Sequence, residues 1–369
     1  MPRSTSTQTK STKRLLVLDV DSTLIDHFGV WARTVDLAVK GWAKSRKMDP
    51  ALLKRRMRQQ MHRSYYTSRG RDNPFFTLYN APEHLIDRVP VLQPRQPGDG
   101  QIAQAVQDLR EQATSFYPGV GKALAALKGK ASAPAIGVLS DGTLHTVVHR
   151  LALSLKHLDE SGELPDGITA LDLIDHVSAQ KDPKSRDFKP SDDPVLARYE
   201  VALMARSTAL PIKLANPLHD PADPDSKAEL ETRKPHAAGF LKLCQRFGVS
   251  AEQAVMIGDN HHDGGLVRAV THVATGGHPD HGKPCFVWQR HGAQLCDLSK
   301  QVNGTLGYHH YKIGLQHTEA ALKTKGIVPA VTLPKGFTSF DRVLNRWDWR
   351  APSPAVKPKS GPADKPATP

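Results

Sequence analysis

Short apolar runs that end at polar residues predict strands buried on both faces of a sheet. The clearest run covers residues 15–18 and ends at Asp19. Two similar runs cover 135–139 and 254–257, and weaker strand candidates lie at 176–179, 272–275 and 328–333. The chain is therefore expected to contain a sheet whose strands are spread over most of its length.

Apolar residues at intervals of three and four predict helices between these strands. Such segments cover residues 101–114, 120–127, 143–158, 194–206 and 235–247. Alternation of strands and helices is typical of a parallel sheet covered on both faces. We therefore predict an α/β fold with a doubly wound, Rossmann-like sheet, in which ligands bind at the carboxyl ends of the strands.

Several segments depart from this alternation. Residues 25–115 show helical spacing of apolar residues over most of their length, without a strand. Residues 181–232 and 278–326 are interpreted as insertions in the core, which otherwise covers 14–24 and 116–345. At the ends, residues 1–13 resemble a flexible basic arm, and the Pro- and Lys-rich residues 346–369 a disordered tail.

The net charge indicates which classes of ligand to expect, and the cysteine content indicates the cellular compartment. Lys and Arg number 50 and Asp and Glu 37 in the 369 residues, which gives a net charge of +13. This excess favours anionic ligands such as phosphates, nucleotides or nucleic acid. The three cysteines form no CxxC pair, so a reducing, cytoplasmic location is expected. No apolar run approaches the ~18 residues that span a bilayer, so no membrane partner is expected.

A stretch rich in His and Cys raises the question of a metal. Its members are His278, His281, Cys285, His291 and Cys296, whose spacing matches no strong zinc template. The sequence leaves open whether this stretch binds a metal.

Polar residues that can take part in catalysis or bind a metal follow the predicted strand ends. Asp19 and Asp21 follow the first, Ser140, Asp141 and Gly142 the second, and Asp259 and Asp263 a later one; Lys234 opens the helix before that strand. In a parallel sheet these groups converge on one edge, where several carboxylates repel one another unless a cation binds. Mg²⁺ prefers a few carboxylate oxygens together with substrate phosphate. This inventory suits phosphoryl transfer, which needs positioning and charge neutralisation.

In this order and spacing the residues resemble the motifs of the haloacid dehalogenase-like (HAD) superfamily of phosphatases. The matching stretches are Asp19-x-Asp21-x-Thr23, Ser140-Asp141-Gly142, Lys234-Pro235 and Gly258-Asp259-Asn260-x-x-Asp263. Tyr117-Pro118-Gly119 resembles the family's connector back from a cap, and residues 338–344 its closing helix. The resemblance implies that residues 25–115 form a helical cap inserted after the first strand.

The resemblance also implies a role for each matching residue. Asp19 would be the nucleophile that forms an aspartyl-phosphate, and Asp21 the general acid and then base. Asp19, the backbone carbonyl of Asp21, Asp259 and Asp263 would hold Mg²⁺. Ser140, Asp141 and Gly142 would bind the phosphoryl group, Lys234 would offset its charge, and Thr23 would fix the turn and line the phosphate site. The implied activity is hydrolysis of a phosphate monoester, of a small phosphorylated metabolite or a nucleotide.

Two alternatives to a small-molecule phosphatase stay open. Between Lys40 and Asp72 the chain is strongly basic and interleaved with aromatic residues, which suits either a solvated helix face or a nucleic-acid contact. The first alternative is therefore a protein that binds nucleic acid or processes its ends on a HAD-like scaffold. The second is a phosphomutase, which needs the same catalytic residues. The substrate and the oligomeric state cannot be deduced from the sequence.

Overall fold

The computed structural model describes residues 14–67, 92–130, 133–181, 187–215, 222, 228–275, 285–290, 306–334, 336–340 and 342–343. Seven strands form one parallel sheet in the order β4-β3-β2-β1-β7-β8-β9. Their bounds are β1 Leu15–Leu18, β2 Ala135–Thr143, β3 His176–Gln180, β4 Ser207–Leu210, β7 Ala254–Gly258, β8 Cys285–Gln289 and β9 Val331–Leu333. A second sheet pairs β5 (Lys213–Ala215) and β6 (Glu229–Glu231) antiparallel. The predicted α/β, Rossmann-like fold is confirmed.

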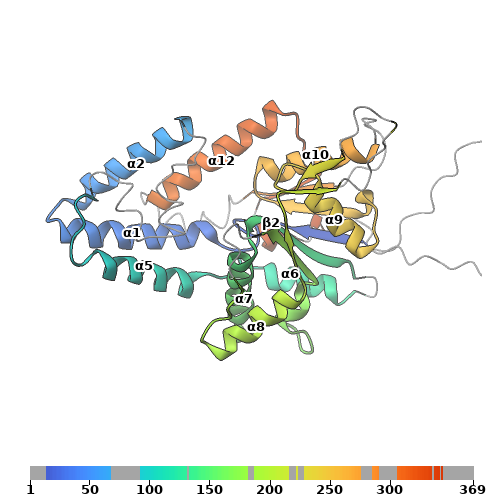
Figure 1. The fold of residues 1–369 in the computed structure, drawn as a ribbon, viewed down its shortest axis with the longest axis horizontal. Helices are drawn as coiled ribbons and strands as arrows, with labels where there is room; N and C mark the ends of the chain where they lie inside the picture. Colours follow the sequence, from blue (N-terminus) through green and yellow to red (C-terminus); the bar gives the residue numbers. More distant parts are fainter. Residues whose placement is uncertain are drawn as a thin grey trace, which may run out of the picture.

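Helices cover both faces of the large sheet (Figure 1). Leu16 and Leu18 of β1 face the hydrophobic cluster that includes α6, α7 and α8, whereas Leu15 and Val17 face the cluster that includes α9, α10 and α12. Alternate burial on two faces is what a continuous apolar run encodes in a parallel sheet. The helix bounds are α6 Val120–Lys128, α7 Leu144–Ser161, α8 Pro194–Ala205, α9 Ala238–Phe247, α10 His261–Thr275 and α12 Leu306–Thr324, with short 3₁₀ turns η3 Ala170–Leu173, η4 Ala251–Gln253 and η5 Gly336–Ser339.

Three helices between β1 and α6 have a hydrophobic cluster of their own. They are α1 (His27–Ser45), α2 (Pro50–Thr67) and α5 (Asp99–Ala113). Their cluster includes Val39, Trp42, Leu53 and Met57, and it is separate from the two clusters on the sheet. These helices extend away from the sheet, and α12 lies against α1 (Figure 1). The helical character predicted for residues 25–115 therefore holds for the part that the structure describes.

One ion pair accounts for part of the basic run in this helical segment. Arg46 Nη1 lies 2.8 Å from Asp99 Oδ1 and Arg46 Nη2 lies 2.9 Å from Asp99 Oδ2. Both side chains are buried, and Arg46 Nε also donates to the carbonyl of Leu92 at 3.0 Å. The pair joins the end of α1 to the start of α5, and it holds the pKa of Asp99 below its usual value. Arg46 is therefore a structural residue and not part of a ligand surface.

The structure corrects three expectations. Residues 272–275 belong to α10 and not to a strand, since Leu266, Val270 and Val273 continue a helical stripe. The supposed insertions 181–232 and 278–326 contribute β4 and β8 to the large sheet. The closing helix expected over 338–344 is described only in part, with the turn η5 up to Ser339 and helical residues at 342–343. The helix expected from Pro235 begins at Ala238, after a turn.

The expectations for residues 1–13 and 346–369 lie outside the described residues, as do His278, His281, His291 and Cys296. Across the part of the chain that the structure describes, every helix is too short or too polar to span a lipid bilayer.

Candidate functional site

The carboxyl ends of β1 and β7 lie level at one edge of the sheet, beside the second half of β2. Leu18 is in register with Val138 of β2 and with Ile257 of β7. Asp19 follows Leu18 directly, Ser140 lies two positions after Val138, and Asp259 lies two positions after Ile257. From β1 the sheet continues to β2, β3 and β4 on one side and to β7, β8 and β9 on the other. Ligands of doubly wound sheets bind at the point where the strand order reverses in this way.

Three carboxylates converge there. One ligand oxygen from each of Asp19, Asp259 and Asp263 lies within 4.8 Å of the others. Asp19 and Asp263 are buried, whereas Asp259 is partly exposed. The predicted acidic cluster is therefore present, with an open side at Asp259.

Lys234 neutralises part of this cluster. Its Nζ donates to Asp19 Oδ1 and to Asp263 Oδ1, the latter at 2.7 Å. Burial raises the pKa of Asp19 well above its usual value and that of Asp263 to about 6, with the Lys234 charge acting against both rises. The charges of Asp19 and Asp263 outweigh the burial of Lys234 and raise the pKa of that ammonium. Lys234 is thus a charged, buried partner of two acids.

The loop after β7 is built around Asp263. The Asn260 amide donates to Asp263 Oδ2 at 3.2 Å, and the indole Nε1 of Trp288 donates to the Asp259 carbonyl at 2.8 Å. A Cβ on Gly258 would lie 2.2 Å from the Asp263 carboxyl carbon, so only glycine admits this carboxylate behind the strand end. The spacing of Gly258, Asp259 and Asp263 follows from this packing.

The turn after β1 holds Asp19 and Asp21 differently. Thr23 is fully buried, and its Oγ1 donates to Asp19 Oδ2 at 3.3 Å. Thr23 therefore contacts the Asp19 carboxylate directly, and its expected place in the phosphate site stays a prediction. Ser22 adopts a left-handed φ of 64° in this turn. The side chain of Asp21 is one-third exposed.

The last residues of β2 support Lys234. The Asp141 carboxylate accepts a hydrogen bond from the Lys234 backbone amide at 2.9 Å. Ser140 is buried, and its Oγ accepts from the Gly142 amide at 3.1 Å. Ser140 and Asp141 therefore shape the edge of the site and join the second and third motifs.

Arg150 on α7 is a residue that the motif analysis missed. Its Nη1 lies 2.7 Å from Asp21 Oδ1 and 2.9 Å from Asp21 Oδ2. The two residues are 129 positions apart, so no local motif connects them. The sequence held one indication of this role, because Arg150 interrupts an otherwise apolar helix face between Val148 and Leu151.

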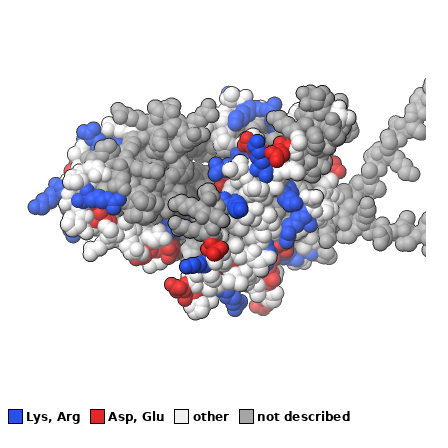
Figure 2. Space-filling view, in the orientation of Figure 1, with Lys and Arg blue, Asp and Glu red and all other residues white. Residues whose placement is uncertain are grey.

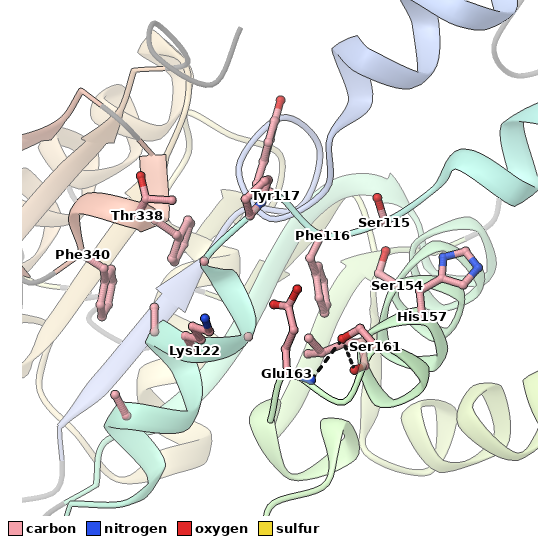
Figure 3. Close-up of a pocket in the computed structure, with 17 residues that line it drawn as sticks. Ser115, Phe116, Tyr117, Lys122, Ser154, His157, Ser161, Glu163, Thr338 and Phe340 are labelled. Carbon is pink, nitrogen blue, oxygen red and sulfur yellow. Dashed lines mark hydrogen bonds between the residues drawn. The ribbon is translucent and has the colours of Figure 1, made fainter. Parts of the chain in front are cut away.

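A cavity of about 670 Å³ lies elsewhere, beside the connector Ser115–Gly119. Figure 3 shows Lys122 of α6 on one side of Phe116 and Ser154 and His157 of α7 on the other. None of the predicted site residues lines this cavity. It is therefore distinct from the acidic cluster.

The comparisons with known proteins concern the fold. A scan against family models found no match, and a search of curated proteins found no relative. A search of solved structures found HAD-superfamily proteins with low similarity to this chain.

Three of these structures illustrate the range. The HAD-hydrolase YfnB from Bacillus subtilis, bound to magnesium, is 11% identical over 90% of this chain and 99% of its own, with a TM-score of 0.42. A HAD family hydrolase from Deinococcus radiodurans with bound phosphate and sodium is 14% identical over 93% and 100%, with a TM-score of 0.41. A 2-haloacid dehalogenase from Pseudomonas syringae is 14% identical over 91% and 100%, with a TM-score of 0.36.

Proposed function

We propose that this chain is a Mg²⁺-dependent phosphatase that hydrolyses a phosphate monoester through an aspartyl-phosphate on Asp19. The observation that supports this most directly is the group of Asp19, Asp259 and Asp263, in which Asp19 and Asp263 are buried together with Lys234. Phosphate monoester hydrolysis requires a nucleophile and concentrated positive charge in a water-poor site. A HAD-like fold alone serves dehalogenation as well, so the proposal depends on these side chains and on Asp21.

The donor set fits a divalent cation. Three carboxylates against one ammonium leave an excess of two negative charges, and burial raises the pKa of both Asp19 and Asp263. Hard oxygen ligands of this kind suit Mg²⁺. Asp19, Asp259, Asp263 and the Asp21 carbonyl would hold the ion, which when bound would polarise a phosphoryl oxygen and screen the nucleophile.

The remaining steps use residues of the chain. A carboxylate oxygen of Asp19 attacks phosphorus, the bond to the leaving oxygen breaks, and the Asp21 carboxyl donates its proton to that oxygen. Asp21 then accepts a proton from water, whose oxygen attacks phosphorus and releases the Asp19 carboxylate. Thr23 orients Asp19, and Lys234 stabilises negative charge beside it.

The helical segment 25–115 is proposed to act as the cap. Its helices follow β1 directly and return to the core through the connector before α6. A cap at this place would shield the acidic cluster from water and select the substrate. We propose a small phosphorylated metabolite or nucleotide as the substrate, in a cytoplasmic setting.

The test is a panel of phosphorylated metabolites, nucleotides and 3′- or 5′-phosphorylated oligonucleotides, assayed for release of inorganic phosphate with and without Mg²⁺. We expect Mg²⁺-dependent release from at least one class and none from the Asp19→Asn variant. Asp166→Asn, at an exposed turn, is the matched control and should keep full activity. Full activity in Asp19→Asn would refute the mechanism. Phosphate that moves within the substrate without release would instead identify a phosphomutase.

One observation supports the nucleic-acid alternative. Arg33, Lys40 and Lys44 are exposed and recur at helical spacing along one side of α1. Figure 2 shows basic side chains at the end of the molecule where α1 lies. A basic stripe on a helix suits a phosphate backbone, so oligonucleotides belong in the panel both as substrates and as ligands.

A further inference from the structure

Arg150 reaches the second motif aspartate from a rigid element. It lies on α7, whose Val147, Val148 and Leu151 are buried in the main hydrophobic cluster. Arg150 itself is only 8% exposed, so its stem is held by packing and only the guanidinium end is directed to the site edge. A side chain held in this way has little rotamer freedom left to lose when it makes a contact.

The contact acts on both oxygens of the Asp21 carboxylate. The two Nη1–Oδ distances, 2.7 and 2.9 Å, are those of charge-assisted hydrogen bonds. The Asp21 side chain is one-third exposed, whereas Arg150 is nearly enclosed. The less mobile partner therefore sets the orientation of the more exposed one.

We propose that Arg150 is the positioning residue of Asp21, which directs its carboxyl group toward the leaving oxygen; this inference rests on the proposed function. General acid catalysis requires the proton donor within hydrogen-bond distance of the oxygen that it protonates, and small displacements are costly. A lysine at this position keeps the charge, but its side chain is shorter than that of arginine and its ammonium would contact Asp21 less closely. Arg150 contributes through Asp21 and not by contact with the phosphoryl group.

The test compares two aryl esters in the same site. Phenyl phosphate has a basic leaving group that needs a proton donor, whereas the leaving group of p-nitrophenyl phosphate departs readily without one. We expect Arg150→Gln to lower kcat/KM for phenyl phosphate by about 100-fold and for p-nitrophenyl phosphate by less than about threefold. Arg150→Lys should give an intermediate loss. Lys156→Gln, which removes a cation from the same helix where it pairs with Glu160, should change neither value.

A double-mutant cycle separates positioning from other roles. In the Asp21→Asn background the substitution Arg150→Gln should cause no further loss, since the residue that it orients has lost its proton. Equal losses for the two esters, or a full additional loss in the Asp21→Asn background, would overturn the inference. If the wild-type chain hydrolyses no ester, or Asp19→Asn stays active, it is the proposed phosphatase function that fails.

Discussion

Lys234 Nζ lies 2.7 Å from Asp263 Oδ1 and also donates to Asp19 Oδ1, so that one buried ammonium bridges acids from two different strand ends. The three side chains are between 0 and 7% exposed. In so dry a place an unpaired charge is costly, and each member of the group depends on the others. The stability of the fold and the chemistry of the site are therefore coupled at Lys234.

Replacement of Lys234 by Met should destabilise the protein and abolish activity. Removal of one partner from a buried ion pair costs about 3–5 kcal/mol, because it leaves uncompensated charge. The free energy of unfolding from urea denaturation without Mg²⁺ should fall by this order, and Mg²⁺ should restore part of it. Lys156→Gln, which removes a surface pair, should cost less than about 0.5 kcal/mol. An equally small loss in Lys234→Met would contradict the coupling.

Magnesium should raise the melting temperature even when no substrate is present. A ligand that binds only the folded state stabilises it in proportion to the logarithm of its concentration over Kd. Thermal unfolding at neutral pH should show a Tm that rises with Mg²⁺ but not with KCl of equal ionic strength. Asp259→Asn removes one partly exposed carboxylate from the cluster and should abolish most of the rise. If the variant shows the same rise, the ion binds elsewhere.

Gly258→Ala should disturb the acidic cluster selectively. The new Cβ would meet the Asp263 carboxyl carbon at 2.2 Å, so either the strand end or Asp263 must move. We expect the effect of Mg²⁺ on Tm to disappear and kcat to fall by at least about 100-fold. Gly100→Ala is the matched control, because a Cβ there meets nothing within 4 Å, and it should leave both unchanged. Similar behaviour of the two variants would argue against the packing of Gly258 on Asp263.

Acid should destabilise the protein partly through His176. Burial and the nearby Arg246 charge lower the pKa of His176 to about 4, below the ordinary 6.5. Between these values the unfolded chain binds more protons than the folded one, so stability falls as the pH falls from 6.5 towards 4. This amounts to about 2 kcal/mol at pH 5. Urea denaturation at pH 7.5 and 5 should show a smaller loss in His176→Gln than in the wild type.

Two comparisons separate the contribution of His176 to the pH dependence from those of other groups. The pKa of Asp263 is raised, so its contribution to stability changes with the opposite sign, and the difference between variant and wild type isolates the histidine. His236→Gln, at an exposed histidine, is the control and should lose as much stability on acidification as the wild type. An unaltered pH dependence in His176→Gln would mean that this imidazole is protonated in the folded state as easily as in water.

Salt dependence should decide whether the basic stripe on α1 binds polyanions. If it does, the affinity for a single-stranded oligonucleotide, measured by fluorescence anisotropy, should fall steeply with salt as counterions are released. Lys40→Gln with Lys44→Gln should lower the slope of log K against log salt by about 1–2. Lys122→Gln with Lys242→Gln removes two exposed lysines elsewhere and should leave the slope unchanged. No binding at physiological salt would remove the nucleic-acid alternative.

Local pattern was sufficient for the centre of the sheet and for its acidic edge. The apolar runs of β1, β2 and β7 are encoded by consecutive buried residues, and the polar residues after them have no other place than the strand ends. Lys234 and Asp263 could be named because their motifs have a fixed order and spacing. The same reasoning failed at residues 272–275, where β-branched side chains are compatible with both a strand and the end of α10.

Contacts between distant segments could be read only from the folded chain. The strand β8 contains a short apolar run, but this run lies in a segment that was interpreted as an insertion, and its place in the sheet is defined by its pairing with β7 and β9. Arg150 meets Asp21, and Thr23 contacts Asp19, because α7 and the turn after β1 pack around the same edge. Periodicity and spacing report which face of an element is buried, whereas side-chain partners across the core depend on how whole elements pack, and the local sequence does not contain that information.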